Sequence, residues 1–298
     1  MDKLSISEVA ESSGTRVPLN FFESTMEIGA ALDWLDNEKL AVAPVKNDKG
    51  EYCALLSVFD LISYAVLGKL PADCPGSLLP EDVPALKEPV ANVVAEGLRR
   101  YRLPIFKKTD SIVGVMVEFS AGKHKVLVTD EEGAAEYMFS QHDMLKFMED
   151  NPSSIPEDLM VKTGDQLGYL MPNIVHAKTT TPTIEILRTL EKHDMTAVPL
   201  LNGKGELAGT FSQSDLKGVS TLMLVDLFLE AMTFLEDEEA RGAGRPLSLK
   251  PDARFGEIML PLAYSGAHRI WVIDEENKVV GVASMTGVIK EVMKATVS

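Results

Sequence analysis

One short pattern recurs four times along the chain, and it limits the possible folds more than any other sequence feature. Each copy contains an apolar run, a serine and then a stretch with apolar residues at helical spacing. The four serines, at intervals of 83, 72 and 72 residues, are Ser57, Ser140, Ser212 and Ser284. Repetition at such a period indicates one duplicated structural unit, so the chain is best interpreted unit by unit.

A second apolar run lies 12 to 14 residues before each serine and predicts a buried strand. These runs are Ala43–Val45, Val126–Val128, Val198–Leu200 and Ile270–Val272. Turn-forming residues separate each run from its serine, at positions 47–50, 130–133, 202–205 and 274–277. Because Asn and Gly tolerate positive φ, every copy is predicted to contain a β-hairpin.

Helical periodicity appears on both sides of this hairpin. Upstream of the third serine it is carried by Ile184, Leu187 and Leu190, and downstream of the second by Met144 and Met148. Each unit therefore has the order strand, helix, strand, strand, helix, which places the chain in the mixed α/β (α+β) class. A unit of about 60 residues is hard to stabilise alone, so we expect two pseudo-symmetric pairs: the first unit with the second, and the third with the fourth.

Three segments are predicted to connect the units. Residues 149–156 contain two prolines and two serines and are expected to link the two pairs, whereas 71–89 contain five prolines and predict an extended connection inside the first pair. The amphipathic run Leu222–Leu235 joins the third and fourth units. The acidic residues 236–239 after it are interpreted as a solvated helix end rather than a docking site for a basic partner.

Charge and composition exclude several classes of function. Lys and Arg number 29 against 45 Asp and Glu, giving a net charge of −16, which disfavours nucleic acid or an anionic membrane as the main partner. Cys53 and Cys74 are too few for a disulfide framework or a cysteine zinc site. The start of the chain does not resemble a signal segment, and no apolar stretch is long enough to cross a bilayer. We therefore expect a cytoplasmic protein, with the nucleus left open as a second compartment.

The repeated ending Gly/Ala-x-x-Ser-x-x-Asp and the stretches Ala267–Asp274 and Val280–Ser284 carry a family resemblance. They resemble cystathionine-β-synthase (CBS) domains, in the four-copy arrangement of two Bateman modules found in the gamma regulatory subunit of AMP-activated protein kinase and its plant and fungal relatives. The resemblance spans residues 16 to 297. It implies the following division: an N-terminal segment 1–15, CBS 1 at 16–69, a Pro-rich connection 70–89, CBS 2 at 90–150, a linker 151–160, CBS 3 at 161–220, a connecting helix 221–245 and CBS 4 at 246–298.

The resemblance implies a regulatory subunit that binds AMP, ADP or ATP in clefts between paired units and modulates a partner protein kinase. In the family, the Asp of Ser-x-x-Asp accepts hydrogen bonds from the ribose hydroxyls. The ribose candidates are then Asp60, Asp143 and Asp215. The hydroxyl candidates near the phosphate are Ser57, Ser140, Ser212, Ser214, Ser284 and Thr286. The fourth unit has Gly287 where the motif has Asp, so we expect that site to be empty or weak.

An acidic protein needs local cations to bind a nucleotide phosphate. The family places them just before the middle strand, where this chain has His124 and Lys125 in the second unit and His268 and Arg269 in the fourth. The equivalent residues of the first and third units are uncharged: Ala41, Val42, Thr196 and Ala197. Arg269 matches a phosphate-binding arginine of the gamma subunit by position. A structural ion pair for the arginine and a core role for the two histidines stay open as alternatives.

A catalytic role is not indicated by the sequence. Ser140, His142 and Asp143 are triad residue types, but they lie within four consecutive positions and cannot converge as nucleophile, base and orienter. No phosphate-binding loop, His-Glu-x-x-His or paired-cysteine motif occurs, so we predict no metal and no cofactor. A CBS scaffold without nucleotide, a regulator of an enzyme other than a kinase, and pairing into a homodimer also stay open.

Overall fold

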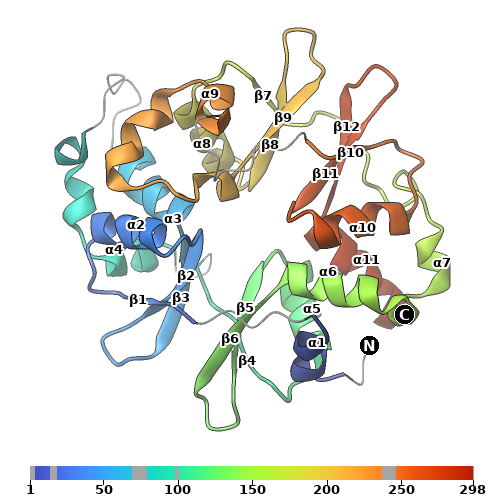
Figure 1. Cartoon of the computed structure of the whole chain (residues 1–298), viewed down its shortest axis with the longest axis horizontal. Coiled ribbons are helices and arrows are strands. Elements are labelled where there is room, and N and C mark those ends of the chain that lie inside the picture. The colour runs from blue at the N-terminus through green and yellow to red at the C-terminus, as the bar shows by residue number, and fades with distance from the viewer. Residues whose placement is uncertain (1–3, 14–18, 69–78, 98–100, 237–245, 298) are drawn as a thin grey trace. The chain divides into compact units, whose positions relative to one another are not determined.

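The computed structural model describes all residues except 1–3, 14–18, 69–78, 98–100, 237–245 and 298. The chain contains four modules of one topology, each with a three-stranded sheet (Figure 1). In every sheet the first strand is parallel to the second, and the second and third form an antiparallel hairpin. The predicted order of strand, helix, strand, strand, helix is confirmed, and so is the mixed α/β class.

The element bounds follow the repeat. Module 1 contains β1 (Phe22–Glu23), α2 (Ile28–Asn37), β2 (Val42–Lys46), β3 (Tyr52–Ser57) and α3 (Val58–Ile62). Module 2 contains β4 (Ile105–Lys107), α5 (Ile112–Ser120), β5 (Lys125–Thr129), β6 (Ala135–Ser140) and α6 (Gln141–Asp150). Module 3 contains β7 (Ala177–Lys178), α8 (Thr183–Lys192), β8 (Ala197–Leu201), β9 (Leu207–Ser212) and the 3₁₀ helix η5 (Gln213–Leu216). Module 4 contains β10 (Ser248–Leu249), α10 (Phe255–Tyr264), β11 (Arg269–Ile273), β12 (Val279–Ser284) and α11 (Met285–Val297).

The hairpin turns explain why each module folds alike. The first turn residue is Asn or Asp, and its side-chain oxygen accepts two backbone N–H groups across the turn, as Asn47 Oδ1 does from Lys49 and Glu51 at 2.9 and 3.0 Å. The other modules repeat these two bonds from Asp130, Asn202 and Asp274. The fourth turn residue has positive φ in all four hairpins: Gly50, Gly133, Gly205 and Asn277. The predicted hairpins are therefore confirmed, and the turn chemistry fixes their register.

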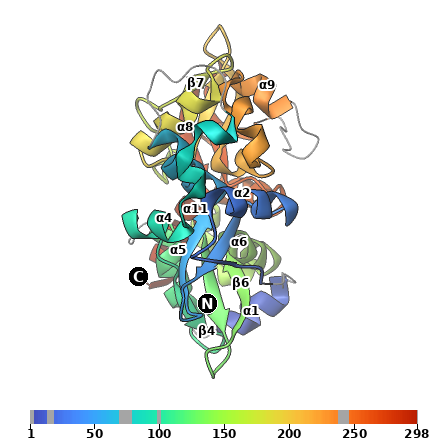
Figure 2. The ribbon, with the colours of Figure 1, turned by 90° about the vertical axis from the view of Figure 1, so that its left-hand side faces the viewer.

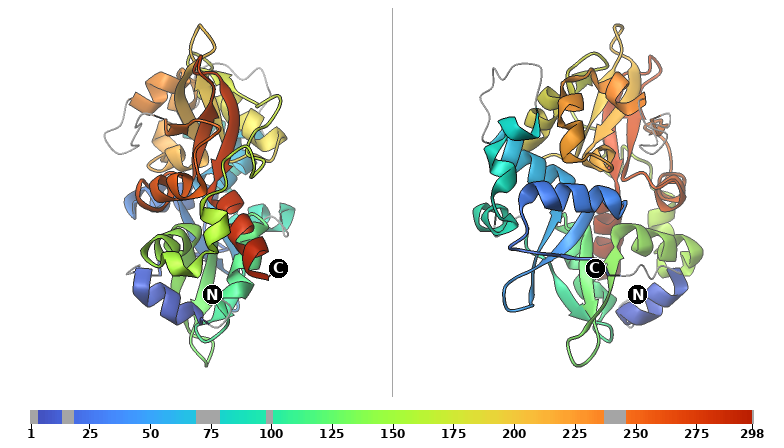
Figure 3. Two further views of the ribbon diagram at one scale, coloured as in Figure 1. Left: turned by 90° about the vertical axis from the view of Figure 1, so that its right-hand side faces the viewer. Right: turned by 60° about the vertical axis from the view of Figure 1, so that its left-hand side comes forward.

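The first of two compact units comprises Met1–Leu19, Pro104–Ile174 and Pro246–Ser298, and so contains modules 2 and 4. Helix α11 packs on α5, α10 packs on α6, and the N-terminal helix α1 (Ile6–Ser13) packs on α6 (Figures 2 and 3). The core of this unit includes Phe119, Phe139 and Phe255, each at most 1% exposed. Burying one such side chain contributes roughly 1.5–3 kcal/mol, so the apolar helix faces hold the two modules together.

The second compact unit comprises Asn20–Leu103 and Val175–Arg245, and so contains modules 1 and 3. Helix α8 packs on η1 (Ser63–Leu67), a π-helical continuation of α3, and α3 packs on η5. The buried residues include Leu32 and Phe59 from module 1 and Leu187 and Phe211 from module 3. The compact units thus join alternate modules, whereas the sequence analysis pairs modules that are adjacent in the chain. The reason is that helix faces, which carry most apolar side chains, pack between alternate modules.

The connecting segments differ from their predictions. The run from 221 onward is not one helix: η6 (Thr221–Phe228) is a 3₁₀ helix and α9 (Ala231–Glu236) is separate, because Glu230 is extended and bridges to Pro182. The predicted acidic end at 237–239 lies outside the described residues. The expected linker 151–160 contains two short helical turns, η4 (Pro152–Ser154) and α7 (Glu157–Met160), with each proline at the start of a turn.

The Pro-rich connection and the third module's last helix also differ in part. Residues 69–78 of the Pro-rich connection lie outside the described part of the chain. The remainder forms η2 (Pro80–Asp82) and η3 (Pro84–Lys87), rather than a fully extended segment, and ends at Pro89, the N-cap of α4 (Val90–Glu96). In module 3 the predicted helix after Ser212 is only the 3₁₀ turn η5, because Lys217 is extended and Gly218 has a φ of +89°.

Candidate functional site

The Ser-x-x-Asp motif forms a reciprocal helix cap in the first three modules. In module 1, Asp60 Oδ2 accepts the backbone N–H of Ser57 at 2.8 Å and its hydroxyl at 2.6 Å, while Ser57 Oγ accepts the N–H of Asp60 at 3.2 Å. Ser140 with Asp143 repeats this cap in module 2, and Ser212 with Asp215 repeats it in module 3. The motif therefore has a structural role that the sequence analysis did not assign, namely the capping box.

One oxygen of each motif carboxylate takes no part in the helix cap. Each carboxylate accepts its cap bonds through Oδ2, so Oδ1 of each Asp is not part of the cap. Asp60 and Asp215 are half-buried, whereas Asp143 is only 2% exposed. A ribose hydroxyl could approach the first two carboxylates more readily than the third.

The fourth module has only half of this cap. The backbone N–H of Gly287 donates to Ser284 Oγ at 3.1 Å, and no carboxylate stands at this position to accept in return. A Cβ atom at Gly287 would lie 3.4 Å from Ser284 Oγ and 3.5 Å from a ring carbon of Tyr169. The motif of module 4 therefore lacks its carboxylate, as the sequence predicts, and the ring of Tyr169 lies beside Gly287.

The sheet register places the candidate cations next to the serines. In every module the serine pairs with the first residue of the middle strand: Val42, Lys125, Ala197 or Arg269. The preceding residue accepts, through its carbonyl, the first N–H of the following helix, as His124 does from Gln141 at 3.0 Å and His268 does from Met285 at 3.1 Å. Modules 2 and 4 therefore each present a histidine, a cation and a helix start at one place.

The helix starts of modules 2 and 4 both belong to the first compact unit, and their histidines lie close together. The rings of His124 and His268 have centroids 5.9 Å apart. We call His124, Lys125, His268 and Arg269 the basic cluster. Gln141, the first residue of α6, connects its two halves: its Nε2 lies 2.9 Å from Thr286 Oγ1 on α11 and 3.1 Å from the carbonyl oxygen of Lys123. The starts of α6 and α11 therefore lie side by side at the basic cluster.

The electrostatics of the cluster favour an anion. Burial, together with the neighbouring charges of Arg269, Lys125 and Lys123, lowers the pKa of His124 to about 4. Burial, with His124, Arg269 and Lys125 as charged neighbours, also lowers the pKa of His268 to about 4. Both imidazoles are therefore neutral at pH 7, and the fixed positive charge comes from the two other members. Two helix starts with their backbone N–H groups add to this field.

One polar atom in the cluster lacks a partner. Nδ1 of His268 is fully enclosed and makes no hydrogen bond to any described residue. A buried polar atom of this kind costs about 1–3 kcal/mol unless a ligand or water satisfies it. It marks the cluster as a place where a bound group would improve the hydrogen bonding of the protein.

The second compact unit has no equivalent of the basic cluster among its described residues at the same register positions. Ala41 and Thr196 occupy the places of the histidines, and their carbonyls cap α3 and η5 at 3.0 and 2.9 Å. Gln213 repeats the position of Gln141, and its Nε2 donates to the carbonyl of Met195 at 3.2 Å. Ser214, a predicted hydroxyl candidate, is exposed on this turn. The candidate hydroxyls and carboxylates are thus present in this unit, while the predicted cations are all in the other one.

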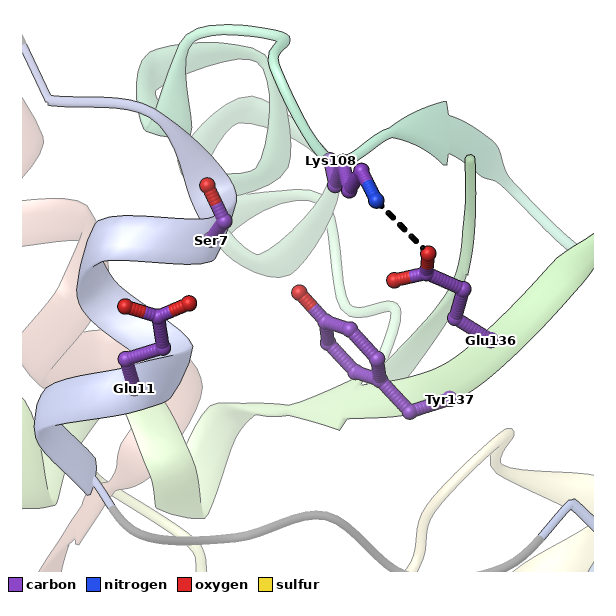
Figure 4. Close-up of a pocket in the computed structure, with 5 residues that line it drawn as sticks. All are labelled: Ser7, Glu11, Lys108, Glu136 and Tyr137. Atoms are coloured by element: carbon purple, nitrogen blue, oxygen red, sulfur yellow. Dashed lines mark hydrogen bonds and ion pairs between the residues drawn. The ribbon is translucent and has the colours of Figure 1, made fainter. Parts of the chain in front are cut away.

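A separate hollow in the first unit lies between α1 and the β4 and β6 strands (Figure 4). It has a volume of about 430 Å³ and is lined by Ser7, Glu11, Lys108, Glu136 and Tyr137, with Lys108 Nζ 2.8 Å from a Glu136 oxygen. Interaction with Glu136 raises the pKa of Lys108. None of these residues is a candidate ligand residue of the repeated motif, so this hollow is distinct from the candidate site.

The described residues contain neither a metal-binding cluster nor a membrane-spanning helix. Among the described residues, no group of three or more His, Cys, Asp or Glu side chains is arranged to hold a metal ion. Within the same residues, no helix combines the length and the apolar character that a membrane span requires.

Comparison with known proteins places the chain in a class. The CBS domain family matches residues 166–220 and 244–294, which carry modules 3 and 4, and the other two modules share their topology and register. Modules 3 and 4 therefore match the CBS domain family, modules 1 and 2 share their topology, and the chain resembles the gamma subunits of the AMP-activated and SNF1-related protein kinases.

The individual relatives agree with this class. The chain is 24% identical over 241 residues to the SNF1-related protein kinase regulatory subunit gamma-like PV42a of Arabidopsis thaliana, covering 70% of this chain and 68% of that protein. The 5'-AMP-activated protein kinase subunit gamma of Saccharomyces cerevisiae is 25% identical over 182 residues, which are 60% of this chain and 56% of the yeast protein. A Methanocaldococcus jannaschii protein, named as a candidate archaeal homologue of the AMPK gamma subunit, shares the fold with a TM-score of 0.67 and 14% identity, covering 97% of this chain and 99% of that one.

Two residues of interest were missed in the sequence. Gln141 carries a detectable signal, because Ser-Gln-x-Asp occurs in modules 2 and 3 at the same place. Tyr169 carries none, since it precedes the first strand of module 3 in the sequence but packs against the motif of module 4. Only the tertiary structure brings it there.

Proposed function

We propose that the chain is a regulatory subunit that binds an adenine nucleotide, AMP, ADP or ATP, and modulates a partner protein kinase. The observation that carries the proposal is the basic cluster. Its four members are the positions at which the family resemblance expects phosphate ligands, and in the first compact unit they lie together beside two helix starts.

The phosphate would be held by Lys125 and Arg269 as fixed cations and by the two histidines as hydrogen-bond donors. Each histidine has one donor nitrogen when neutral and two when protonated. A phosphate between them would favour protonation because it opposes the repulsion from the two cations. The hydroxyls of Ser140, Ser284 and Thr286 lie at the same helix starts and could complete the phosphate contacts.

The ribose contacts remain those expected from the motif. The candidates are the carboxylates of Asp60, Asp143 and Asp215, which accept their cap bonds through Oδ2. The hydroxyls of Ser57, Ser212 and Ser214 are the corresponding candidates in the second unit. A bound nucleotide would act by population shift, because a ligand that prefers one arrangement of the modules increases its population and so changes contact with the partner.

The kinase partner and the absence of catalysis are part of the same proposal. The plant and yeast relatives described above are named as kinase gamma or gamma-like subunits, and the plant protein's name calls it a regulatory subunit. No nucleic acid or membrane is proposed as a partner of so acidic a chain. We place the protein in the cytoplasm, where such a kinase would meet it, and leave homodimer formation as a further part of the proposal.

A scaffold without nucleotide is the second candidate function, and one observation favours it. The Ser-x-x-Asp motif is accounted for by helix capping alone, and the second unit lacks the predicted cations. Denaturing the purified protein and analysing the supernatant for adenine nucleotide separates the two candidates. Nucleotide in proportion to protein supports the sensor, whereas its absence, together with no binding of added AMP, ADP or ATP, supports the scaffold.

The partner is tested by recovering the tagged protein from its own cells and identifying the proteins bound to it. A kinase catalytic subunit enriched over an unrelated acidic control supports the proposal. Enrichment of an enzyme of another class would indicate that the chain regulates that enzyme and not a kinase.

A further inference from the structure

The segment 169–171 forms an extra edge on the sheet of module 4. Val282 N donates to the carbonyl of Tyr169 at 2.9 Å, and Met171 N donates to the carbonyl of Val280 at 3.0 Å. Leu170 bridges to Gly281 between these bonds. The backbone of this segment therefore lies directly on β12, three residues before the motif serine.

A glycine makes this close approach possible. A Cβ atom at Gly281 would collide with the carbonyl oxygen of Tyr169 and with the backbone of Leu170. Modules 1 and 2 have Ala54 and Tyr137 at the equivalent position. Module 3 has Gly209 at this position. In module 1 the N–H of Leu55 donates to the carbonyl of Tyr101 at 3.0 Å, so a preceding segment bonds to that strand as well. What Gly281 adds in module 4 is room for a closer backbone.

The side chain of Tyr169 lies against the incomplete motif. A ring carbon is 3.5 Å from the place of a Cβ at Gly287, and the same place is 3.4 Å from Ser284 Oγ. Tyr169 is 7% exposed and belongs to the hydrophobic core of the first unit. Its ring thus stands beside the serine and the helix start at the position where the other three modules have their Asp.

The hydroxyl of Tyr169 is buried and makes no hydrogen bond to any described residue. Burial, together with the charge of Glu291, raises its pKa. A phenylalanine would fill the same space without the cost of an unsatisfied hydroxyl. The ring of Tyr169, rather than its hydroxyl, is therefore the part of the side chain that closes the motif.

We propose that Tyr169 is a built-in plug that closes the motif of module 4 to an adenosine ligand. The ligand class rests on the proposed function. The plug has two parts: Gly281 admits the backbone of the segment, and the ring of Tyr169 fills the space beside Gly287. Loss of the motif Asp is then only half of the reason why the motif of module 4 would not hold a ribose, because restoring the carboxylate leaves the ring in place.

The test is the number of AMP molecules bound per chain, measured by equilibrium dialysis with radiolabelled AMP. The variants are Gly287→Asp, Tyr169→Thr with Gly287→Asp, and a matched control, Leu170→Thr with Gly287→Asp, which changes the exposed neighbour and keeps the ring. We expect one additional AMP per chain in the Tyr169→Thr double variant only. An equal gain in Gly287→Asp alone, or no gain in a folded double variant, overturns the plug.

The outcomes separate the plug from the proposed function. Binding by the wild type with no gain in the double variant rejects the plug and keeps the sensor. A gain in the double variant with no binding by the wild type keeps the plug and rejects the sensor, and no binding by either rejects both.

A measurement on the wild type covers the case in which the double variant does not fold. Tetranitromethane nitrates accessible tyrosines, and Tyr264 is 54% exposed and serves as the internal reference. The plug predicts that the peptide containing Tyr169 stays unmodified while that of Tyr264 is nitrated. Nitration of both at similar rates would contradict it.

Discussion

The imidazole rings of His124 and His268 lie 5.9 Å apart, with their planes inclined by 42°. One ring comes from each module of the first compact unit, and each precedes the strand that starts with Lys125 or Arg269. The pKa of both histidines is lowered to about 4. The protein thus keeps two neutral histidines beside two fixed cations, and an added anion would change their protonation.

The first prediction concerns stability in acid. The pKa of an unfolded histidine is about 6.5, so between pH 6.5 and 4 the unfolded state binds protons that the folded state does not. The free energy of unfolding should therefore fall as the pH falls through this window, by up to about 3 kcal/mol for each histidine. Urea unfolding of the ligand-free protein at several pH values measures it.

The matched variants for this prediction are His124→Gln with His268→Gln, and the exposed His193→Gln as control. The double variant should lose most of the decline between pH 6.5 and 4, while the control keeps it. Equal pH profiles for all three proteins would show that the buried histidines do not set the acid stability.

The second prediction concerns protons taken up on binding. A phosphate at the basic cluster raises the pKa of His124 and His268 from about 4. Nucleotide binding at pH 6.5 should therefore take up protons. Calorimetric titration in two buffers of different ionisation enthalpy measures the number, and His124→Gln with His268→Gln should reduce it. An unchanged proton count in that variant argues that the phosphate binds elsewhere.

The third prediction separates capping from ribose binding. Asp215→Ala removes the acceptor of the Ser212 N–H and hydroxyl, which should cost about 0.5–2 kcal/mol of stability. If the carboxylate also binds ribose, affinity should fall roughly ten- to a hundredfold. Ser214→Ala, on the exposed side of the same turn, is the stability control. Lower stability with unchanged affinity would leave Asp215 a cap only.

The fold of each module could be predicted from the sequence, but the packing of the modules against one another could not. Periodicity and turn residues such as Gly50 and Asn277 act within one module, so the hairpins and the order of elements were predictable. Which helix faces meet depends on contacts distant in sequence, and there the expected pairing of adjacent modules differs from the compact units. The 3₁₀ turn after Ser212 was also missed, because Gly218 ends it after one turn.

The site was predictable in part for the same reason. The positions of Lys125 and Arg269 follow from the repeat, but their meeting through Gln141 and Thr286 needs the packing of α6 against α11. The capping role of Ser-x-x-Asp is local and was available from the spacing, although the family resemblance drew attention to ribose instead.

The fourth prediction uses two glycines of module 4. Gly287→Ala places a Cβ at ordinary contact distances of 3.4 and 3.5 Å inside a helix, so it should stabilise the protein by about 0.5–1 kcal/mol. Gly281→Ala places a Cβ against the backbone of Tyr169 and should destabilise the protein by about 1–3 kcal/mol. Thermal unfolding of the two variants compares them directly, and equal effects would show that segment 169–171 does not lie on β12.

The central claim is that the basic cluster binds the phosphate of an adenine nucleotide. Calorimetric titration with AMP, ADP and ATP should be made on the wild type, on Lys125→Met with Arg269→Met, and on Lys108→Met, which alters the separate hollow in the same unit. We expect a Kd well below about 1 mM for at least one nucleotide in the wild type and in Lys108→Met, and affinity at least about tenfold weaker in the double variant. No binding of any of the three by the wild type, or equal affinity in the double variant, would contradict the account.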